Sequence, residues 1–281
     1  MIAALPFPYP FDTAAMQRAL VACVAVGIFA PMIGTFLVQK RLSLIGDGVG
    51  HVAFAGVGAG LLLGLWPVWT ALAFAVAGAV GVEMLRARRK ASGDLALALF
   101  FYSGIALGVV FVSRGGLPDP ETLPYLFGDP LHMTSAGVVA IVAIGAAVAS
   151  GAWWLRRPLF AVVTDEDWSR VAGLPVDALG GVLAALTAAV IVAGMRIVGI
   201  LLVAALMVLP VASAQLLARS FRSTLRLAVA IGAGSAIVGL VGARVLGLAP
   251  GGAIGLVAAA LFAVVAIAKR GAPRTLQQEA H

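Results

Sequence analysis

Runs of about 20 apolar residues recur along the whole chain and are separated by short polar segments. A run of this length crosses the roughly 30 Å hydrocarbon core of a bilayer as an α-helix. Hydrophobic residues make up 62% of the chain, charged residues only 11%, and the mean hydropathy is +1.08, which excludes a large soluble enzyme. The sequence therefore predicts an all-α fold, a polytopic bundle of transmembrane helices that forms one domain over residues 1–281.

The short segments between the runs orient the predicted bundle, because Lys and Arg favour the cytoplasmic side. We expect about eight or nine spans, eight if one run is buried without crossing the membrane. This layout places 15 of the 19 Lys and Arg inside, with the N-terminus outside and the C-terminus in the cytoplasm. The predicted spans cover about residues 15–38, 41–64, 69–85, 95–112, 134–155, 178–194, 197–217 and 227–246, followed by a last span that ends at Lys269 and Arg270.

The formal net charge of +7 raises two possibilities, a nucleic-acid partner and a membrane surface. The basic residues lie in short clusters between the apolar runs, as in 86–90 and 219–226. Such clusters are typical of membrane orientation and of contact with anionic lipid headgroups. We therefore expect membrane lipid, and no nucleic acid, as a partner.

Residues 41–64 form an apolar run that carries two ionisable side chains, Asp47 and His51. Their spacing of four residues places both on one face of a helix. Counted from Arg41 at 1.5 Å per residue, His51 would lie about 15 Å into the membrane, near its midplane. An ionisable side chain at that depth costs roughly 2.5–3.5 kcal/mol on insertion scales, so it normally faces a partner or a polar pathway.

A carboxylate and an imidazole together suit a divalent cation such as zinc, manganese or iron. The single cysteine, Cys23, excludes a thiolate cluster and a disulfide framework. Two alternatives remain open for Asp47 and His51: an internal ion pair or hydrogen bond that only fixes helix packing, and a proton relay. Two ligands are too few for a closed tetrahedral site, and a second copy of the chain would complete four.

Small residues recur in the same run, with Gly56, Gly60 and Gly64 at four-residue spacing. In membranes this spacing lets helices approach closely. We therefore expect these glycines to serve helix packing.

Two further positions stand out at or near other span ends. Glu83 and Asp94, which flank the basic loop after the third run, are expected to form local ion pairs rather than to bind metal.

The predicted cytoplasmic segment 156–175 reads RRPLFAVVTDEDWSRVAGLP. Thr164 followed by Asp167 is typical of a capping box, and the acidic residues between them favour a helix start. Gly173 and Pro175 would end the helix. We expect one short helix over about 164–173, which is either an ordinary interfacial helix or a docking element for a partner. The presence of both caps favours docking.

The predicted outer segment, residues 114–133, reads RGGLPDPETLPYLFGDPLHM. It is too polar to span a membrane, and its prolines and glycines predict a loop with short helical turns. Its acidic and imidazole side chains could attract a cation or contact a binding protein, or they could form an ordinary solvated face. These side chains are Asp119, Glu121, Asp129 and His132.

Four segments together resemble the membrane permease subunit of bacterial zinc and manganese ABC importers. They are residues 41–51 (RLSLIGDGVGH), 125–131 (YLFGDPL), 164–176 (TDEDWSRVAGLPV) and 198–218 (VGILLVAALMVLPVASAQLLA). The resemblance covers essentially the whole chain. It implies that Asp47 and His51 line the metal pathway. It also implies two permease and two ATPase subunits, fed from outside by a metal-binding protein.

The resemblance further implies that the cytoplasmic segment is a coupling helix, which fits into a groove of the ATPase. The positions that match it include Thr164, Asp165, Glu166, Asp167, Trp168, Ala172 and Gly173. The chain also departs from many relatives. Gly50 replaces a serine before the histidine and so removes a hydroxyl that could form a hydrogen bond to a metal ligand, and the proline that often follows the histidine in manganese-type relatives is missing. The missing proline favours zinc over manganese or iron.

No GxxxxGK[ST] phosphate loop occurs in the chain, so we expect ATP to be bound and hydrolysed by a separate protein. The chain itself is then a non-enzymatic transport subunit of the bacterial cytoplasmic membrane, with no permanent cofactor and with Zn²⁺ or Mn²⁺ as the transported ion. Two rival functions remain. One is a proton-coupled secondary metal transporter, and the other is an ABC permease for an iron chelate or vitamin B12.

Overall fold

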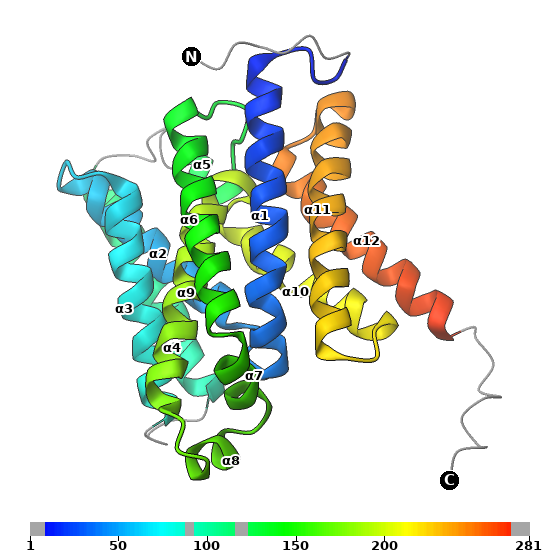
Figure 1. Cartoon of the computed structure of the whole chain (residues 1–281). Coiled ribbons are helices and arrows are strands. Elements are labelled where there is room, and N and C mark those ends of the chain that lie inside the picture. Colours follow the sequence, from blue (N-terminus) through cyan, green and yellow to red (C-terminus); the bar gives the residue numbers. More distant parts are fainter. Residues whose placement is uncertain (1–8, 88–92, 116–122, 271–281) are drawn as a thin grey trace.

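The computed structural model describes residues 9–87, 93–115 and 123–270, and all the regular secondary structure in these ranges is helical (Figure 1). Within them, nine helices are long and apolar enough to cross a membrane, as the sequence predicts. These are α1 (Ala14–Gln39), α2 (Ile45–Leu62), α3 (Pro67–Ala87), α4 (Gly93–Arg114), α6 (Ser135–Trp154), α9 (Val176–Val198), α10 (Ile200–Leu217), α11 (Phe221–Leu246) and α12 (Pro250–Arg270). Three short helices complete the described part: α5 (Leu123–Phe127), α7 (Arg156–Thr164) and α8 (Glu166–Val171).

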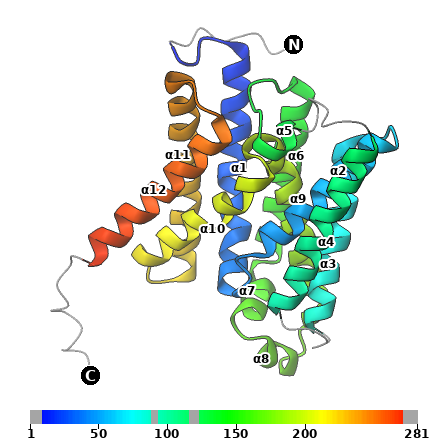
Figure 2. The ribbon, with the colours of Figure 1, turned by 180° about the vertical axis from the view of Figure 1, so that it is seen from behind.

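The long helices form two groups joined by a central set (Figures 1 and 2). On one side, α2 packs against α3 and α4, and on the other, α10, α11 and α12 pack against one another. Between them, α1, α6 and α9 contact each other, α3 packs on α9, and α10 reaches α2. The short helices lie at opposite ends of the bundle, α5 near the start of α1, and α7 and α8 near its end. Helix α2 therefore lies within the bundle and contacts four other long helices.

Two of the three predicted packing glycines of α2 serve close helix approach. A Cβ atom at Gly56 would lie 2.7 Å from the Cα atom of Ala71 on α3, closer than carbon atoms pack. Gly60 likewise faces Thr70 at the start of α3. Gly64 differs, because it lies beyond the end of α2 at φ +64 with nothing near its missing side chain. The chain turns here through a left-handed backbone conformation, which glycine adopts readily.

The boundary between α9 and α10 differs from the predicted one. The sequence places a span end near Gly194, but α9 continues to Val198, and only Gly199 separates the two helices. Gly199 has φ +87 and packs its backbone against Phe127 of the preceding α5 segment. A single glycine is enough to connect the two helices, because it adopts a backbone conformation that other residues rarely adopt.

Candidate functional site

The metal-binding candidates Asp47 and His51 lie in the first half of α2. The helix begins at Ile45 rather than at Arg41, because Arg41 to Leu44 form a turn in which Arg41 has φ +60. Asp47 consequently lies in the first helical turn, where its negative charge complements the helix dipole. His51 lies about 9 Å along the helix axis from Ile45, so the 15 Å depth expected from the sequence is too large as a helical distance.

Both side chains are half-buried and face α4. Asp47 lines a cavity of about 370 Å³ together with apolar side chains of α4 that include Phe101 and Tyr102. The Phe101 ring also meets the His51 imidazole edge-on, with 4.7 Å between the ring centroids. Within the described residues, neither Asp47 nor His51 has an ion pair or a hydrogen bond from its side chain. The two side chains therefore do not form, within this part of the chain, the ion pair or hydrogen bond that would serve helix packing alone.

Glycines bring α4 and α10 up to the backbone around His51. A Cβ atom at Gly104 of α4 would lie 2.7 Å from the Val52 nitrogen and 2.8 Å from the His51 carbonyl carbon. On another side, a Cβ atom at Gly50 would lie 3.2 Å from Cγ1 of Ile200 on α10. A side chain at position 50 would press on Ile200 here, so the glycine suits the close packing of α2 on α10.

One copy of the chain supplies few metal ligands. In the described ranges, no group of three or more His, Cys, Asp or Glu side chains lies close enough to hold a metal ion. Cys23 is buried in α1 and free. Asp47 and His51 therefore offer one carboxylate and one imidazole, which is an incomplete coordination shell for a transition metal.

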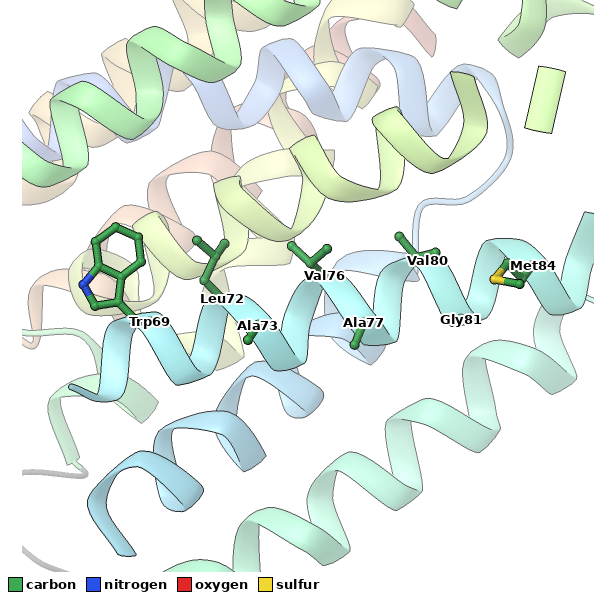
Figure 3. A pocket seen from close by; sticks show the side chains of 8 residues that line it. All are labelled: Trp69, Leu72, Ala73, Val76, Ala77, Val80, Gly81 and Met84. Atoms are coloured by element: carbon green, nitrogen blue, oxygen red, sulfur yellow. The ribbon is translucent and has the colours of Figure 1, made fainter. Parts of the chain in front are cut away.

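A second pocket of the described structure, about 590 Å³ in volume, runs along the outer face of α3 (Figure 3). Its lining consists of α3 side chains from Trp69 to Met84, and none of them is ionisable. A groove of this kind suits lipid chains rather than a metal ion. It contributes nothing to the candidate site on α2.

One short helix, α8, lies within the predicted range 164–173, and another, α7, precedes it, with Asp165 between the two. Thr164 is the last residue of α7, and its hydroxyl donates a hydrogen bond to the Phe160 carbonyl at 2.8 Å. The capping box expected at Thr164 is therefore wrong. Asp165 has an extended backbone, and its carboxylate accepts the Trp168 N–H at 2.8 Å, so it caps α8. A charged acceptor at this position stabilises the helix start.

The end of α8 is as the sequence predicts. Ala172 is the C-cap of α8, and Gly173 follows at φ +81, a backbone conformation that only glycine adopts readily. Trp168 and Val171 are 64% and 88% exposed. Asp167 is exposed as well, and it forms no ion pair within the described residues. Helix α8 thus presents an apolar and acidic surface beyond the end of the bundle.

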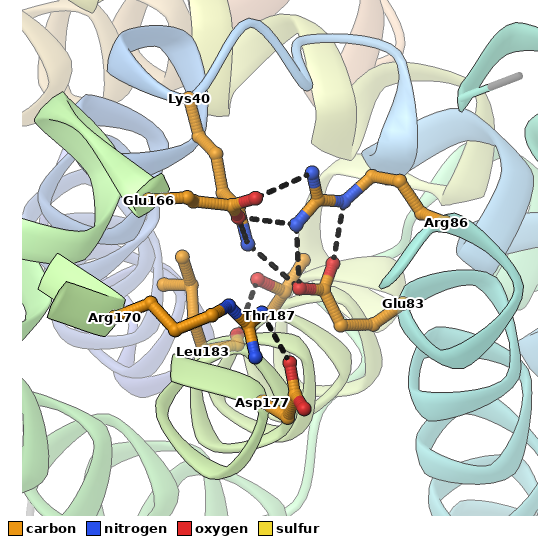
Figure 4. A network of polar contacts seen from close by, with 8 residues as sticks. All are labelled: Lys40, Glu83, Arg86, Glu166, Arg170, Asp177, Leu183 and Thr187. Carbon is orange, nitrogen blue, oxygen red and sulfur yellow. Dashed lines mark hydrogen bonds and ion pairs between the residues drawn. The ribbon is translucent and has the colours of Figure 1, made fainter. Parts of the chain in front are cut away.

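Glu166 joins a charge network that the sequence analysis missed (Figure 4). Lys40 Nζ lies 2.7 Å from Glu83 Oε1 and 3.1 Å from Glu166 Oε1. Arg86 lies 2.8 Å from Glu83 and donates a hydrogen bond to Glu166 Oε2 at 3.2 Å. Glu83 is a local ion-pair partner of Arg86, as expected, but it also reaches α1. The signal in the sequence was an acidic residue inside the third apolar run.

The surroundings of Glu166 set its charge state. Burial of its carboxyl raises the pKa, but the hydrogen bond from Arg86 and the charges of Lys40 and Arg86 outweigh this effect and hold the pKa below its ordinary value. Glu166 is therefore ionised at neutral pH. An exposed ion pair between Arg170 and Asp177, 2.9 Å apart, lies beside the network.

The outer-segment candidates are only partly described. Asp119 and Glu121 lie outside the described residues. Asp129 and His132 are brought together, with His132 Nδ1 2.8 Å from the Asp129 carboxylate and the imidazole largely exposed. The Asp129 backbone N–H donates to the Arg196 carbonyl at the end of α9, which anchors this pair to the bundle. The predicted short helical turn is α5.

Residues 12–269 match the family model described as the ABC 3 transport family. The chain belongs to the ABC 3 transport family. It is 30% identical over 225 residues to the manganese transport system membrane protein MntC of Listeria monocytogenes, which covers 80% of each chain. It is 31% identical over 226 residues to a probable metal transport system membrane protein of Treponema pallidum, covering 80% of this chain and 85% of that one.

Structural comparison agrees with the sequence comparison. A chain of PsaBC from Streptococcus pneumoniae, solved in complex with Fab, matches with a TM-score of 0.81 and 28% identity over 90% of this chain and 91% of that one. The protein is thus a metal ABC transporter permease and a multi-pass protein of the bacterial inner membrane. Its relatives are transport subunits, which agrees with the expected non-enzymatic role.

Proposed function

We propose that this permease moves a divalent transition-metal ion into the cytoplasm, with Asp47 and His51 as transient ligands. The observation that carries the proposal is the pairing of a carboxylate and an imidazole on one face of a spanning helix, beside a cavity and without an ion pair or a side-chain hydrogen bond in the described structure. Intramembrane ionisable residues of this kind mark substrate pathways. Incomplete ligation suits transport, because a closed high-affinity site would retain the ion.

A second copy of the chain would complete the ligand set. Two copies supply two carboxylates and two imidazoles, which is enough for four-coordinate binding. The cavity beside Asp47 is bordered by Leu44 and Tyr102, whose side chains are 63% and 69% exposed. A partner permease can therefore approach Asp47 from the α4 side. This assembly is part of the proposal.

We further propose that α8 is the docking element for a separate cytoplasmic ATPase, which binds and hydrolyses ATP. The exposed Trp168 and Val171 provide apolar contact area, and the acidic residues Asp165 and Asp167 add charge at the same place. Gly173 sets the sharp end of the helix. At the opposite end, the Asp129–His132 pair is a contact candidate for a metal-loaded binding protein outside the membrane.

The cargo is proposed to be zinc or manganese, since oxygen and nitrogen donors without thiolate accept both. The sequence departure after His51 favours zinc, and the names of several relatives favour manganese. A relative from Yersinia pestis, 30% identical over 234 residues, is named for chelated iron transport. An iron chelate is therefore the second candidate cargo.

The test is metal uptake into proteoliposomes that contain the complete permease–ATPase complex. Radioactive zinc and manganese are each offered with the other metal, or with an iron chelate, as competitor. We expect ATP-dependent uptake of one free ion and no inhibition by the chelate. Uptake that needs only a proton gradient would instead identify a secondary transporter, and preferential uptake of the chelate would replace the proposed cargo.

A further inference from the structure

The charge network around Glu166 links three elements that are far apart in the sequence. Lys40 caps the end of α1, Glu83 and Arg86 lie in the last turns of α3, and Glu166 begins α8 (Figure 4). The network contains two cations and two anions, so its charges balance. Each of the four side chains contacts two of the others.

Burial makes this network more than a surface feature. The side chains of Lys40 and Glu83 are only 4% and 7% exposed. Removing one partner of a buried pair leaves an uncompensated charge, which is strongly destabilising, whereas an exposed pair contributes little. Helix α9 is also fitted to the network, because a Cβ atom at Gly180 would lie 3.1 Å from the Glu83 carboxyl carbon. A larger residue at this position would displace Glu83.

Glu166 connects α8 by ion pairs to the end of α1 and to α3, whereas the exposed Arg170–Asp177 pair connects α8 to the start of α9. Helix α8 itself packs on α7 and on the start of α9, and Ser169 is its one buried residue. Through Glu166 it reaches Lys40 and Arg86 as well. Lys40 is separated from α2 only by the turn of residues 41–44. Helix α3 packs along α2, and a Cβ atom at Gly78 would lie 2.9 Å from Val52, the neighbour of His51.

We propose that the Lys40–Glu83–Arg86–Glu166 network transmits the movement of α8 to α2, and that Glu166 is the positioning residue of this link. The inference rests on the proposed function, in which an ATPase moves α8. When α8 shifts, we expect the paired charges to shift with it, because Glu166 pairs with both Arg86 and the buried Lys40. Lys40 then displaces the start of α2, and Arg86 displaces α3, so the metal ligands change position.

The test compares the number of metal ions transported per ATP hydrolysed in proteoliposomes that contain the complete permease–ATPase complex. For Glu166→Gln we expect an assembled complex that still hydrolyses ATP, with the transport ratio lowered at least about fivefold, the lower end of typical coupling between sites. The matched control is Asp177→Asn, which breaks the exposed Arg170–Asp177 pair beside the network and should leave the ratio within about twofold of wild type.

A charge-balanced variant separates transmission from folding. Lys40→Met with Glu166→Gln removes one cation and one anion and leaves the Glu83–Arg86 pair within α3. This double variant should assemble even if Glu166→Gln does not, and it should remain uncoupled. An unchanged ratio in an assembled complex of either variant would overturn the inference, as would an equal loss in Asp177→Asn. Absence of uptake by the wild-type complex would instead refute the proposed function.

Discussion

Gly104 offers a direct test of how closely α4 must approach the metal-binding candidates. In Gly104→Ala the new methyl group would lie 2.7 Å from the Val52 nitrogen and 2.8 Å from the His51 carbonyl carbon. Both atoms belong to the backbone, so no side chain can rotate away. Since carbon atoms pack at about 3.5–4.0 Å, α2 and α4 must separate by roughly 1 Å. Overpacking of this kind costs about 1–3 kcal/mol.

A matched control removes the effect of helix propensity. Alanine is favoured over glycine in a helix by about 1 kcal/mol, and this gain applies equally to Gly234→Ala on α11, where nothing lies within 4 Å of the added atom. The difference in unfolding free energy between the two variants is therefore the steric cost, about 1–3 kcal/mol.

The measurement is thermal unfolding of the detergent-solubilised complex, followed by uptake in proteoliposomes. Gly234→Ala should unfold at or above the wild-type temperature, and Gly104→Ala below it. Uptake by Gly104→Ala should also fall, because His51 is displaced from Phe101 and from the ligands that the second copy of the chain would supply. If Gly104→Ala were as stable and as active as Gly234→Ala, the close approach of α4 to His51 would be refuted.

Three further predictions address the ligands, the network and the docking helix. Asp47→Asn and His51→Ala should each abolish metal uptake while the complex still assembles, and normal accumulation in both would remove them from the pathway. The pKa of Glu166 is lower in the folded protein than its ordinary value of about 4.5. Its stabilising charge is therefore fully present above about pH 4.5 and is lost as the pH falls through the lowered pKa of the folded state. Unfolding temperatures of wild type should therefore drop with acidification in this range, and those of Glu166→Gln should drop less. Trp168→Ala should weaken ATPase binding about tenfold, measured by co-purification and titration, without changing the fold of the permease, because an exposed aromatic contributes to docking and not to the core.

The number and order of the spans followed from the sequence because each depends on a local property, about 20 apolar residues between polar ends. The same locality explains the success at Gly173, where glycine and a following proline predict a helix end whatever surrounds them. Helix starts were less accurate. Thr164 and Asp165 are both residue types that cap helix starts. Asp165 caps α8, and the Thr164 hydroxyl instead donates a hydrogen bond within α7.

The charge network could not be predicted, because it depends on which span ends meet in space. Lys40, Glu83 and Glu166 are separated by 43 and 83 positions along the chain, and each reads as an ordinary charge near a span end. Only the packing of α3 on α9 and of α7 on α1 brings them together. The site shows the same limit, since Asp47 and His51 were found from their spacing, but Phe101 and Gly104 of α4 were not.

The turn between α1 and α2 is where the proposed link and the proposed metal site meet. Lys40 ends α1 within the network, and Asp47 lies in the first turn of α2. Arg41 between them has φ +60, which costs a non-glycine residue about 1–3 kcal/mol and persists only where its neighbours fix it. The N–H groups of Arg41 and Leu42 donate to carbonyls of the last turn of α1. We therefore expect a short turn held in this way to pass a displacement of Lys40 on to α2, whereas a long flexible loop would take it up.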